Sequence, residues 1–233
     1  FALGKMYGYI FAFLLVCLCG TTYVSLEGDG IYSAVEGQNK FRIKYLSVYL
    51  LAMFADWLQG PYVYVLYESY GFSISDIALL FIAGFGSSMV FGAVVGSMSD
   101  LYGRKLLCLG YCVFYALGCI TKLSSSFYIL LFGRILCGIA TSILFSAFES
   151  WMVHEHHSHD FPAIDIGRTF YLATFGNGLV AILSGYAASA VADSFGFVAP
   201  FMLAAVALTI NFGLIYVTWT ENYGSGGDTS SLP

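Results

Sequence analysis

The chain has 233 residues, of which 59% are hydrophobic and 10% are charged, and its formal net charge is −5. Soluble globular domains carry about 25% charged residues, so this composition excludes a soluble fold and predicts an integral membrane protein. No basic patch is present, so nucleic acid is not expected as a partner. The six cysteines lie in apolar stretches and imply no disulfide framework.

The apolar stretches predict seven membrane-spanning helices, because one span needs about 20 apolar residues. In chain order they are residues 6–26, 43–67, 77–98, 106–122, 127–153, 169–192 and 197–219. Residues 6–26 are too long for a typical signal peptide and precede no Ala-x-Ala site, so we interpret them as a retained extra helix. The predicted domains are therefore 1–42, the extra helix and its connector, and 43–220, a six-helix bundle. Residues 221–233, rich in Gly and Ser, predict a disordered cytoplasmic linker.

A short polar hinge separates the third and fourth predicted spans. It holds Gly96, Asp100, Gly103, Arg104 and Lys105. Gly103 allows the positive φ that a tight turn between helices can require, and clustered basic residues mark a short loop as cytoplasmic. With the hinge inside the cell, most basic residues also lie inside, and only Lys5 and Lys122 lie outside. This layout places the amino end outside and the carboxyl tail inside.

Charged residues within the spans are the strongest indication of a functional site, since each costs about 2.5–3.5 kcal/mol to insert. Asp56 lies mid-way in the second span and Arg134 lies in the fifth. Helical spacing aligns other polar residues with them, and these are Tyr45, Tyr49, Gln59, Thr141 and Glu149. Two polar faces at similar depth predict a shared water-filled cleft. The alternative is an Asp56–Arg134 ion pair that only locks two helices together.

Several further features have both structural and functional interpretations. Pro61, after Gly60, predicts a broken helix that either lines a cavity or is a simple kink. Asn177 fits a contact with a neighbouring helix slightly better than a contact with a ligand. Small residues recur every fourth position in the third span and predict a tight helix seam; they are Gly84, Ser88, Gly92 and Gly96.

All four histidines lie between His154 and Asp160, in a predicted polar loop over residues 154–167. Such a cluster can bind a metal or sense pH, but the spacing lacks the paired histidines of a catalytic zinc helix. We therefore interpret it as a solvated loop, and expect no metal site and no cofactor.

The spacing Gly-x3-Asp-x2-Gly-Arg-Lys over residues 96–105 resembles the signature loop of the major facilitator superfamily. Arg134-x3-Gly138 resembles the superfamily's motif on the fourth core helix, where the arginine is implicated in substrate or proton coupling. Residues 55–62 and 144–151, with His154-Glu155-His156, resemble the eukaryotic molybdate-anion transporter family, also called major facilitator superfamily domain-containing protein 5. Asp160-Phe161-Pro162 and Glu221-Asn222-Tyr223 fit that family as well.

This resemblance implies an all-α integral membrane fold: the N-terminal six-helix half of a facilitator plus one extra transmembrane helix, with the C-terminal half missing. It implies a multi-pass secondary transporter of molybdate in the cell membrane, working by alternating access and not as an enzyme. Arg134 would bind the anion, and Asp56 or Glu149 could carry a proton. Sulfate or a carboxylate would suit such a site equally. The alternatives are a facilitator for another small anion, a seven-helix receptor and a membrane metalloenzyme using the histidines.

Overall fold

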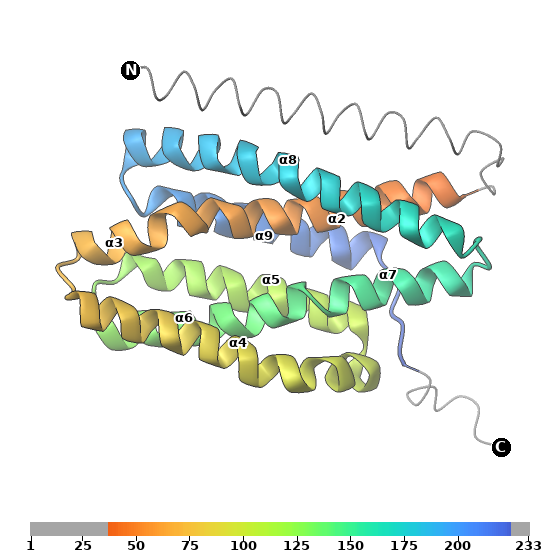
Figure 1. Cartoon of the computed structure of the whole chain (residues 1–233), viewed down its shortest axis with the longest axis horizontal. Helices are drawn as coiled ribbons and strands as arrows, with labels where there is room; N and C mark the ends of the chain where they lie inside the picture. The colour runs from red at the N-terminus through yellow and green to blue at the C-terminus, as the bar shows by residue number, and fades with distance from the viewer. Residues whose placement is uncertain (1–36, 225–233) are drawn as a thin grey trace. The chain divides into compact units, whose positions relative to one another are not determined.

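A computed structural model describes residues 37–224 of the chain. The chain divides into two units, Phe1–Asn39 and Lys40–Pro233. The predicted extra helix at 6–26 and the tail at 225–233 lie outside the described residues. Within residues 37–224 the secondary structure is entirely helical, as the sequence predicts (Figure 1).

The chain forms the following helices in order, with two short 3-10 turns labelled η. They are α2 (Gln38–Gln59), η1 (Gly60–Tyr62), α3 (Val63–Ser69), α4 (Ile74–Tyr102), α5 (Arg104–Ile120), η2 (Thr121–Leu123), α6 (Phe127–Leu144), α7 (Ala147–Ser158), α8 (Ile164–Phe195) and α9 (Ala199–Thr218).

Five helical segments of the described part are long and apolar enough to cross a membrane: Ile74–Tyr102, Arg104–Leu123, Phe127–Ser158, Ile164–Phe195 and Ala199–Thr218. They correspond to the third to seventh predicted spans. The predicted span at 43–67 is also helical, as α2 and α3, but is not among the five. Basic residues occupy the start of α2, and η1, with Pro61, separates it from α3. The six-span count of the bundle therefore stays a prediction.

The hinge is shorter than its sequence suggests. Helix α4 begins with a capping box between Ser73 and Asp76 and continues to Tyr102, so residues 96–102 are helical rather than part of a loop. Gly103 alone separates α4 from α5, with a φ of 105°. The predicted positive φ at Gly103 is thus confirmed. This backbone conformation ends α4, and glycine suits the position because other residues adopt such a φ only under strain.

The fifth predicted span and the loop after it are both corrected. The helix of residues 127–153 is interrupted at Phe145 and Ser146, and α7 then continues to Ser158. His154 to His157 are therefore helical, and α8 already begins at Ile164, so residues 159–163 alone form the connection. The polar end of α7 is partly buried, since Glu155 and His156 are both buried there. Packing against other segments therefore keeps these polar residues helical.

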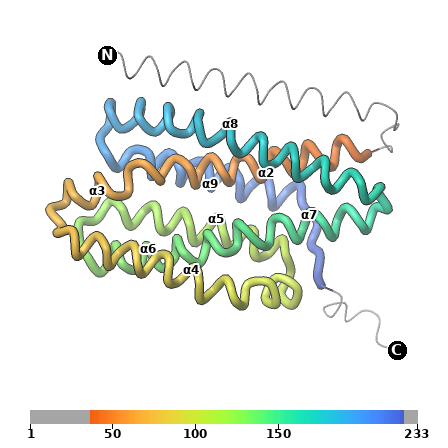
Figure 2. Tube along the Cα trace, viewed as in Figure 1, coloured from red at the N-terminus to blue at the C-terminus, as the bar shows by residue number. Residues whose placement is uncertain are grey.

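The seam predicted on α4 packs against α6, while α5 lies between α6 and α9 (Figure 2). A Cβ atom added to Gly138 of α6 would lie 2.2 Å from the carbonyl oxygen of Gly84. The Ser142 hydroxyl donates to the Ser88 carbonyl oxygen at 2.7 Å, and a Cβ at Gly92 would meet Ser142 at 3.7 Å. Gly96 departs from the prediction, since a Cβ there meets open space.

The basic residues predicted to be cytoplasmic gather at one end of the bundle. They lie where α2, α5 and α8 begin: Lys40, Arg42, Lys44, Arg104, Lys105 and Arg168. Arg42 links the starts of two of these helices, since its Nη2 lies 3.2 Å from Oδ1 of Asp165 on α8. This common end agrees with the predicted layout, and its cytoplasmic orientation stays a prediction.

Candidate functional site

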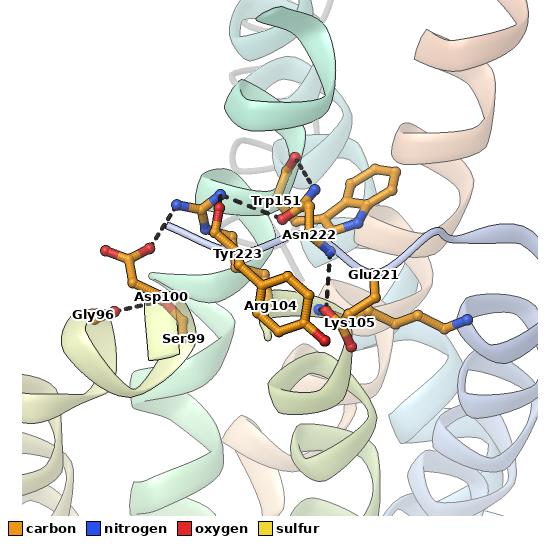
Figure 3. Close-up of polar contacts among 9 residues, drawn as sticks. All are labelled: Gly96, Ser99, Asp100, Arg104, Lys105, Trp151, Glu221, Asn222 and Tyr223. Atoms are coloured by element: carbon orange, nitrogen blue, oxygen red, sulfur yellow. Dashed lines mark hydrogen bonds and ion pairs between the residues drawn. The ribbon is translucent and has the colours of Figure 1, made fainter. Parts of the chain in front are cut away.

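The segment that follows α9, residues 219–224, returns across the hinge and is held there, and we call it the strap (Figure 3). The backbone N–H of Gly224 donates to the Asp100 carbonyl oxygen at 3.0 Å, and that of Arg104 donates to the Asn222 carbonyl oxygen at 3.0 Å. The prediction that a disordered linker begins at residue 221 is therefore wrong for 221–224. Hydrogen bonds to groups distant in sequence order these residues despite their polar composition.

Glu221 places its carboxylate on the first turn of α5. Its two oxygens accept the backbone N–H groups of Lys105 at 2.8 Å and Leu106 at 3.0 Å. These donors have no partner within the helix, and the helix dipole favours a negative charge there. A Cβ atom at Gly103 would lie 2.6 Å from the Glu221 carboxyl carbon, so a larger residue there would displace this carboxylate in addition to straining φ.

Arg104 is the centre of the hinge network. Its Nη2 donates to Oδ1 of Asp100 at 2.6 Å across Gly103. Its Nη1 donates to Oδ1 of Asn222 at 3.3 Å and to the Tyr223 carbonyl oxygen at 3.2 Å (Figure 3). Both terminal nitrogens of this arginine therefore bind the protein itself, and the predicted hinge residues Asp100, Gly103 and Arg104 act together on the strap.

Helix α7 holds the other side of the strap. The Trp151 indole stacks on Trp219 with ring centres 3.7 Å apart, and its Nε1 donates to the Thr220 carbonyl oxygen at 2.8 Å. The carboxylate of the buried Glu155 accepts from the Thr220 hydroxyl at 2.6 Å and from Nδ2 of Asn222 at 3.2 Å. Sequence reasoning quoted Trp151, Glu155 and Asn222 only for their family resemblance and missed that the two motifs touch.

Arg134, the predicted anion ligand, lies within the bundle against α4. Its guanidinium covers Gly84, where an added Cβ would lie 2.8 Å from Nη2. Nε donates to the Leu80 carbonyl oxygen at 3.3 Å, and the guanidinium carbon lies 4.9 Å from the centre of the Phe81 ring. Among the described residues, no carboxylate pairs with Arg134 and no hydrogen bond engages its two terminal nitrogens.

Asp56 faces a different helix. Its Oδ1 accepts a hydrogen bond from the Tyr115 hydroxyl of α5 at 2.5 Å. The alternative of a locking Asp56–Arg134 ion pair is wrong, because the ion pairs of residues 37–224 are Arg42–Asp165 and Arg104–Asp100. Both Asp56 and Arg134 are near enough to Cys137 to act on it electrostatically. A water-filled cleft shared by the two stays a prediction.

The remaining predicted polar residues mostly bind their own surroundings. Gln59 donates to the Ala55 carbonyl oxygen of its own helix at 3.1 Å. Thr141 donates likewise to Cys137, and the buried Tyr49 ring stacks on Tyr45.

Asn177 of α8 accepts a hydrogen bond from the Trp57 Nε1 of α2 at 2.8 Å. The preferred interpretation of Asn177 as a helix contact is thereby confirmed.

Glu149 lies near enough to Tyr45 and Tyr49 to act on them electrostatically. It lines a pocket of about 430 Å³ together with Arg104, Ser150, Val153, His154, His157 and Phe170. The interruption of the helix at Phe145 and Ser146 removes Glu149 from the helical spacing that aligned it with Arg134. In the described part of the chain, no group of three His, Cys, Asp or Glu side chains is placed to hold a metal ion.

Lys122 is a candidate that the sequence reasoning missed. The sequence places it at the outer end of the fourth predicted span and assigns it no role. Its side chain is 0% exposed, and its Nζ donates to the Tyr67 hydroxyl at 2.7 Å. The Tyr70 hydroxyl donates to the Lys122 carbonyl oxygen, and burial raises the pKa of Tyr70, which keeps this donor protonated. No carboxylate pairs with Lys122 within residues 37–224. A lysine at the end of a span usually extends to the membrane interface, so its position in the sequence does not indicate burial. Only Tyr67 and Tyr70 could have indicated a buried partner for it.

The chain matches known membrane transporters along nearly all of its length. Residues 6–232 match the model of the MFS_5 family, described as sugar transporters with 12 transmembrane segments. Curated relatives named molybdate-anion transporter come from Takifugu rubripes, 42% identical over 78% of this chain and 38% of the relative, and Xenopus tropicalis, 39% identical over 79% and 42%. A third, from Danio rerio, is 39% identical over 82% of this chain and 41% of the relative.

The helical fold, the apolar spans and the hinge with its glycine define a membrane protein of the major facilitator type. The chain belongs to the MFS_5 family, together with relatives that are named as molybdate-anion transporters. It spans about two fifths of the length of those relatives, and its matches lie in their N-terminal half.

Proposed function

We propose that this chain forms the N-terminal six-helix half of a secondary transporter that carries molybdate, or a similar oxyanion, across the cell membrane by alternating access. The observation that carries this proposal is the state of Arg134. Its guanidinium lies inside the bundle with no carboxylate partner and two terminal nitrogens free of hydrogen bonds among the described residues. A cation kept in this position is costly, and an anion that binds to it would offset the cost.

An anion fits the interior better than a neutral sugar does, although the family model is described as sugar transporters. Two cations, Arg134 and Lys122, lie in the spans without a carboxylate partner in the described part of the chain. Neutral hydroxyl groups would leave both charges uncompensated, whereas a tetrahedral oxyanion accepts charge-assisted hydrogen bonds from a guanidinium in pairs. Sulfate shares this chemistry with molybdate and is the closest competing substrate.

Asp56 is the proposed proton carrier for this transport. It lies within the same bundle, and the Tyr115 hydroxyl holds it by donating to its Oδ1. Protonation of Asp56 would change this hydrogen bond between α2 and α5. Proton binding would thereby be coupled to the packing of these two helices. The seven-helix receptor is not favoured by any contact in the structure.

Uptake of labelled molybdate by cells that express the complete protein containing this chain tests the proposal. We expect Arg134→Ala to lower uptake about tenfold to a hundredfold, because charge-assisted hydrogen bonds contribute about 1.5–3 kcal/mol. Gly84→Ala provides a second perturbation, since its Cβ would overlap the position of Nη2 and displace a flexible side chain. Its effect should be smaller and should leave the thermal stability of the protein nearly unchanged.

Lys40→Ala is the matched control, because it removes an exposed cation at the end of the bundle. An excess of sulfate should compete with molybdate, and an excess of glucose should not. Undiminished uptake by Arg134→Ala at equal expression would remove Arg134 from the site. Competition by sugar alone would replace the anion with a neutral substrate.

A further inference from the structure

Helices α4 and α5 leave an apolar groove between them beyond the hinge. Its volume is about 490 Å³, and its walls include Phe91, Met98 and Tyr102 of α4, Leu106 and Gly110 of α5, and Phe212 of α9. The groove forms because α4 packs along α6 rather than along α5 after the two helices separate at Gly103. Side chains at its rim are exposed, with Tyr102 at 56% and Leu106 at 54%. In a membrane-spanning bundle, such a rim contacts lipid.

A cation is held at the hinge end of this groove. Lys105 lies one helical turn before Leu109, which also lines the groove. Its Nζ donates to the Tyr216 carbonyl oxygen at 3.0 Å and lies 5.5 Å from the centre of the Tyr216 ring. That ring stacks on Phe212, with ring centres 6.4 Å apart. The wall of the groove therefore leads directly to an ammonium group.

The ammonium of Lys105 has capacity for a ligand. It carries three N–H donors, and the hydrogen bond to Tyr216 uses one of them. A second cation, Lys44, is near enough to interact with Lys105 electrostatically. Two carboxylates also lie nearby: Glu155 acts on Lys44, and Glu221 binds the backbone N–H of Lys105 and leaves its ammonium to Tyr216. No carboxylate pairs with either lysine among residues 37–224.

We propose that this groove binds one anionic glycerophospholipid, with an acyl chain between α4 and α5 and the phosphate on Lys105. The groove is apolar along its length and cationic at its end, which matches the two parts of such a lipid. Tyr102 and Tyr216 border it at the level of Lys105, and tyrosine favours the membrane interface. A peptide helix about 10 Å across fills ~850 Å³ in two turns, more than the groove offers.

Native mass spectrometry of the purified chain, offered equal amounts of dioleoyl phosphatidylglycerol and dioleoyl phosphatidylcholine, tests the proposal. The two lipids share acyl chains, so a difference in binding reports the headgroup. We expect the wild-type chain to retain one phosphatidylglycerol in about fivefold preference, and Lys105→Gln to lose that preference while keeping a donor for Tyr216. Gly110→Phe should reduce binding of both lipids, because it fills the groove.

The substitution at Gly110 is chosen because an added Cβ would meet only the Phe114 ring, at 3.7 Å. Val113→Trp fills the same groove from an exposed position and replaces Gly110→Phe if that variant does not fold. Lys40→Gln is the charge control and should bind as the wild type does.

Equal binding of the two lipids by the wild-type chain, or wild-type binding by both Lys105→Gln and the filled groove, would overturn the site. Equal losses in Lys40→Gln and Lys105→Gln would also overturn it, in favour of a diffuse surface attraction. The readout involves no transport, so it is independent of the proposed substrate.

Discussion

Charged residues at the hinge end of the bundle have partners of opposite charge or backbone partners, whereas the cations of its interior have no carboxylate partner among the described residues. At the hinge, Arg104 binds Asp100 and the strap with both terminal nitrogens, and Glu221 binds two backbone donors. In the interior, Arg134 and Lys122 have no carboxylate partner in the described part of the chain. Each instead contacts aromatic rings, Phe81 and Tyr67 respectively.

This difference separates groups that hold the structure from groups available for a ligand. A charge that binds an opposite charge and several backbone groups of the protein stabilises one arrangement of helices, and its removal should be seen as lost stability. A cation inside the bundle without an opposite charge adds little to stability, and under the proposed function its role is to bind an anion transiently. Stability and uptake, measured on the same variants, should therefore respond to different sets of residues.

Trp151→Ala should have the largest effect and should act on stability. The side chain is fully buried, stacks on Trp219 and donates to Thr220, so its loss leaves a cavity and releases the strap. We expect the free energy of unfolding to fall by about 3–5 kcal/mol, as for other buried aromatic truncations. Thermal unfolding in detergent measures it, with Tyr186→Ala, at an exposed position, as the control. A small loss, equal to that of the control, would mean that the strap is not held by α7.

Lys122→Met should have the opposite profile. Replacing a buried ion pair by apolar groups of similar volume is often neutral or stabilising by about 1–4 kcal/mol. Lys122→Met leaves no carboxylate unpaired among the described residues, although the Tyr67 hydroxyl loses its partner. We therefore expect nearly unchanged thermal stability and about tenfold lower molybdate uptake, which corresponds to about 1.4 kcal/mol. Tyr67→Phe separates the roles, since it removes the hydrogen bond but keeps the charge. Lost stability with normal uptake per folded molecule would make Lys122 structural.

The elements that could be predicted from sequence are those with local signals. Gly103 and the charges beside it located the turn between two spans, and the recurring Gly84, Ser88 and Gly92 located the seam with α6. The preference for a helix contact at Asn177 was also correct. Each of these depends on residues a few positions apart, or on the general rule that polar groups in a bilayer find partners.

The elements that could not be predicted depend on contacts between distant segments. The strap binds Glu155 and Arg104, which lie 65 and 119 positions away from its binding residues. The polar composition of the strap gives no sign of these distant partners and by itself indicates disorder. The interruption of the helix at Phe145 contains no proline or glycine to announce it. The burial of Lys122 depends on Tyr67, which precedes it by 55 positions.

Glu221→Gln should have a smaller effect than the two variants above. The amide keeps one oxygen as an acceptor, but the negative charge at the start of α5 is lost, together with one of the two bonds to Lys105 and Leu106. We expect a loss of about 1 kcal/mol in the free energy of unfolding, as for other charges at helix ends. Glu68→Gln, at an exposed position on α3, is the matched control. If both variants unfold alike, the carboxylate does not stabilise the hinge.

Gly96→Ala should have the smallest effect, and it tests the hinge from its least constrained position. An added Cβ meets open space at Gly96, whereas at Gly138 it would lie 2.0 Å from the Ser87 hydroxyl oxygen. Alanine is favoured over glycine within a helix by about 0.5–1 kcal/mol, so Gly96→Ala should slightly raise stability, while Gly138→Ala should lower it. Thermal unfolding compares the two. Reduced uptake by a stable Gly96→Ala protein would mean that another segment approaches Gly96 during transport, in an arrangement different from this one.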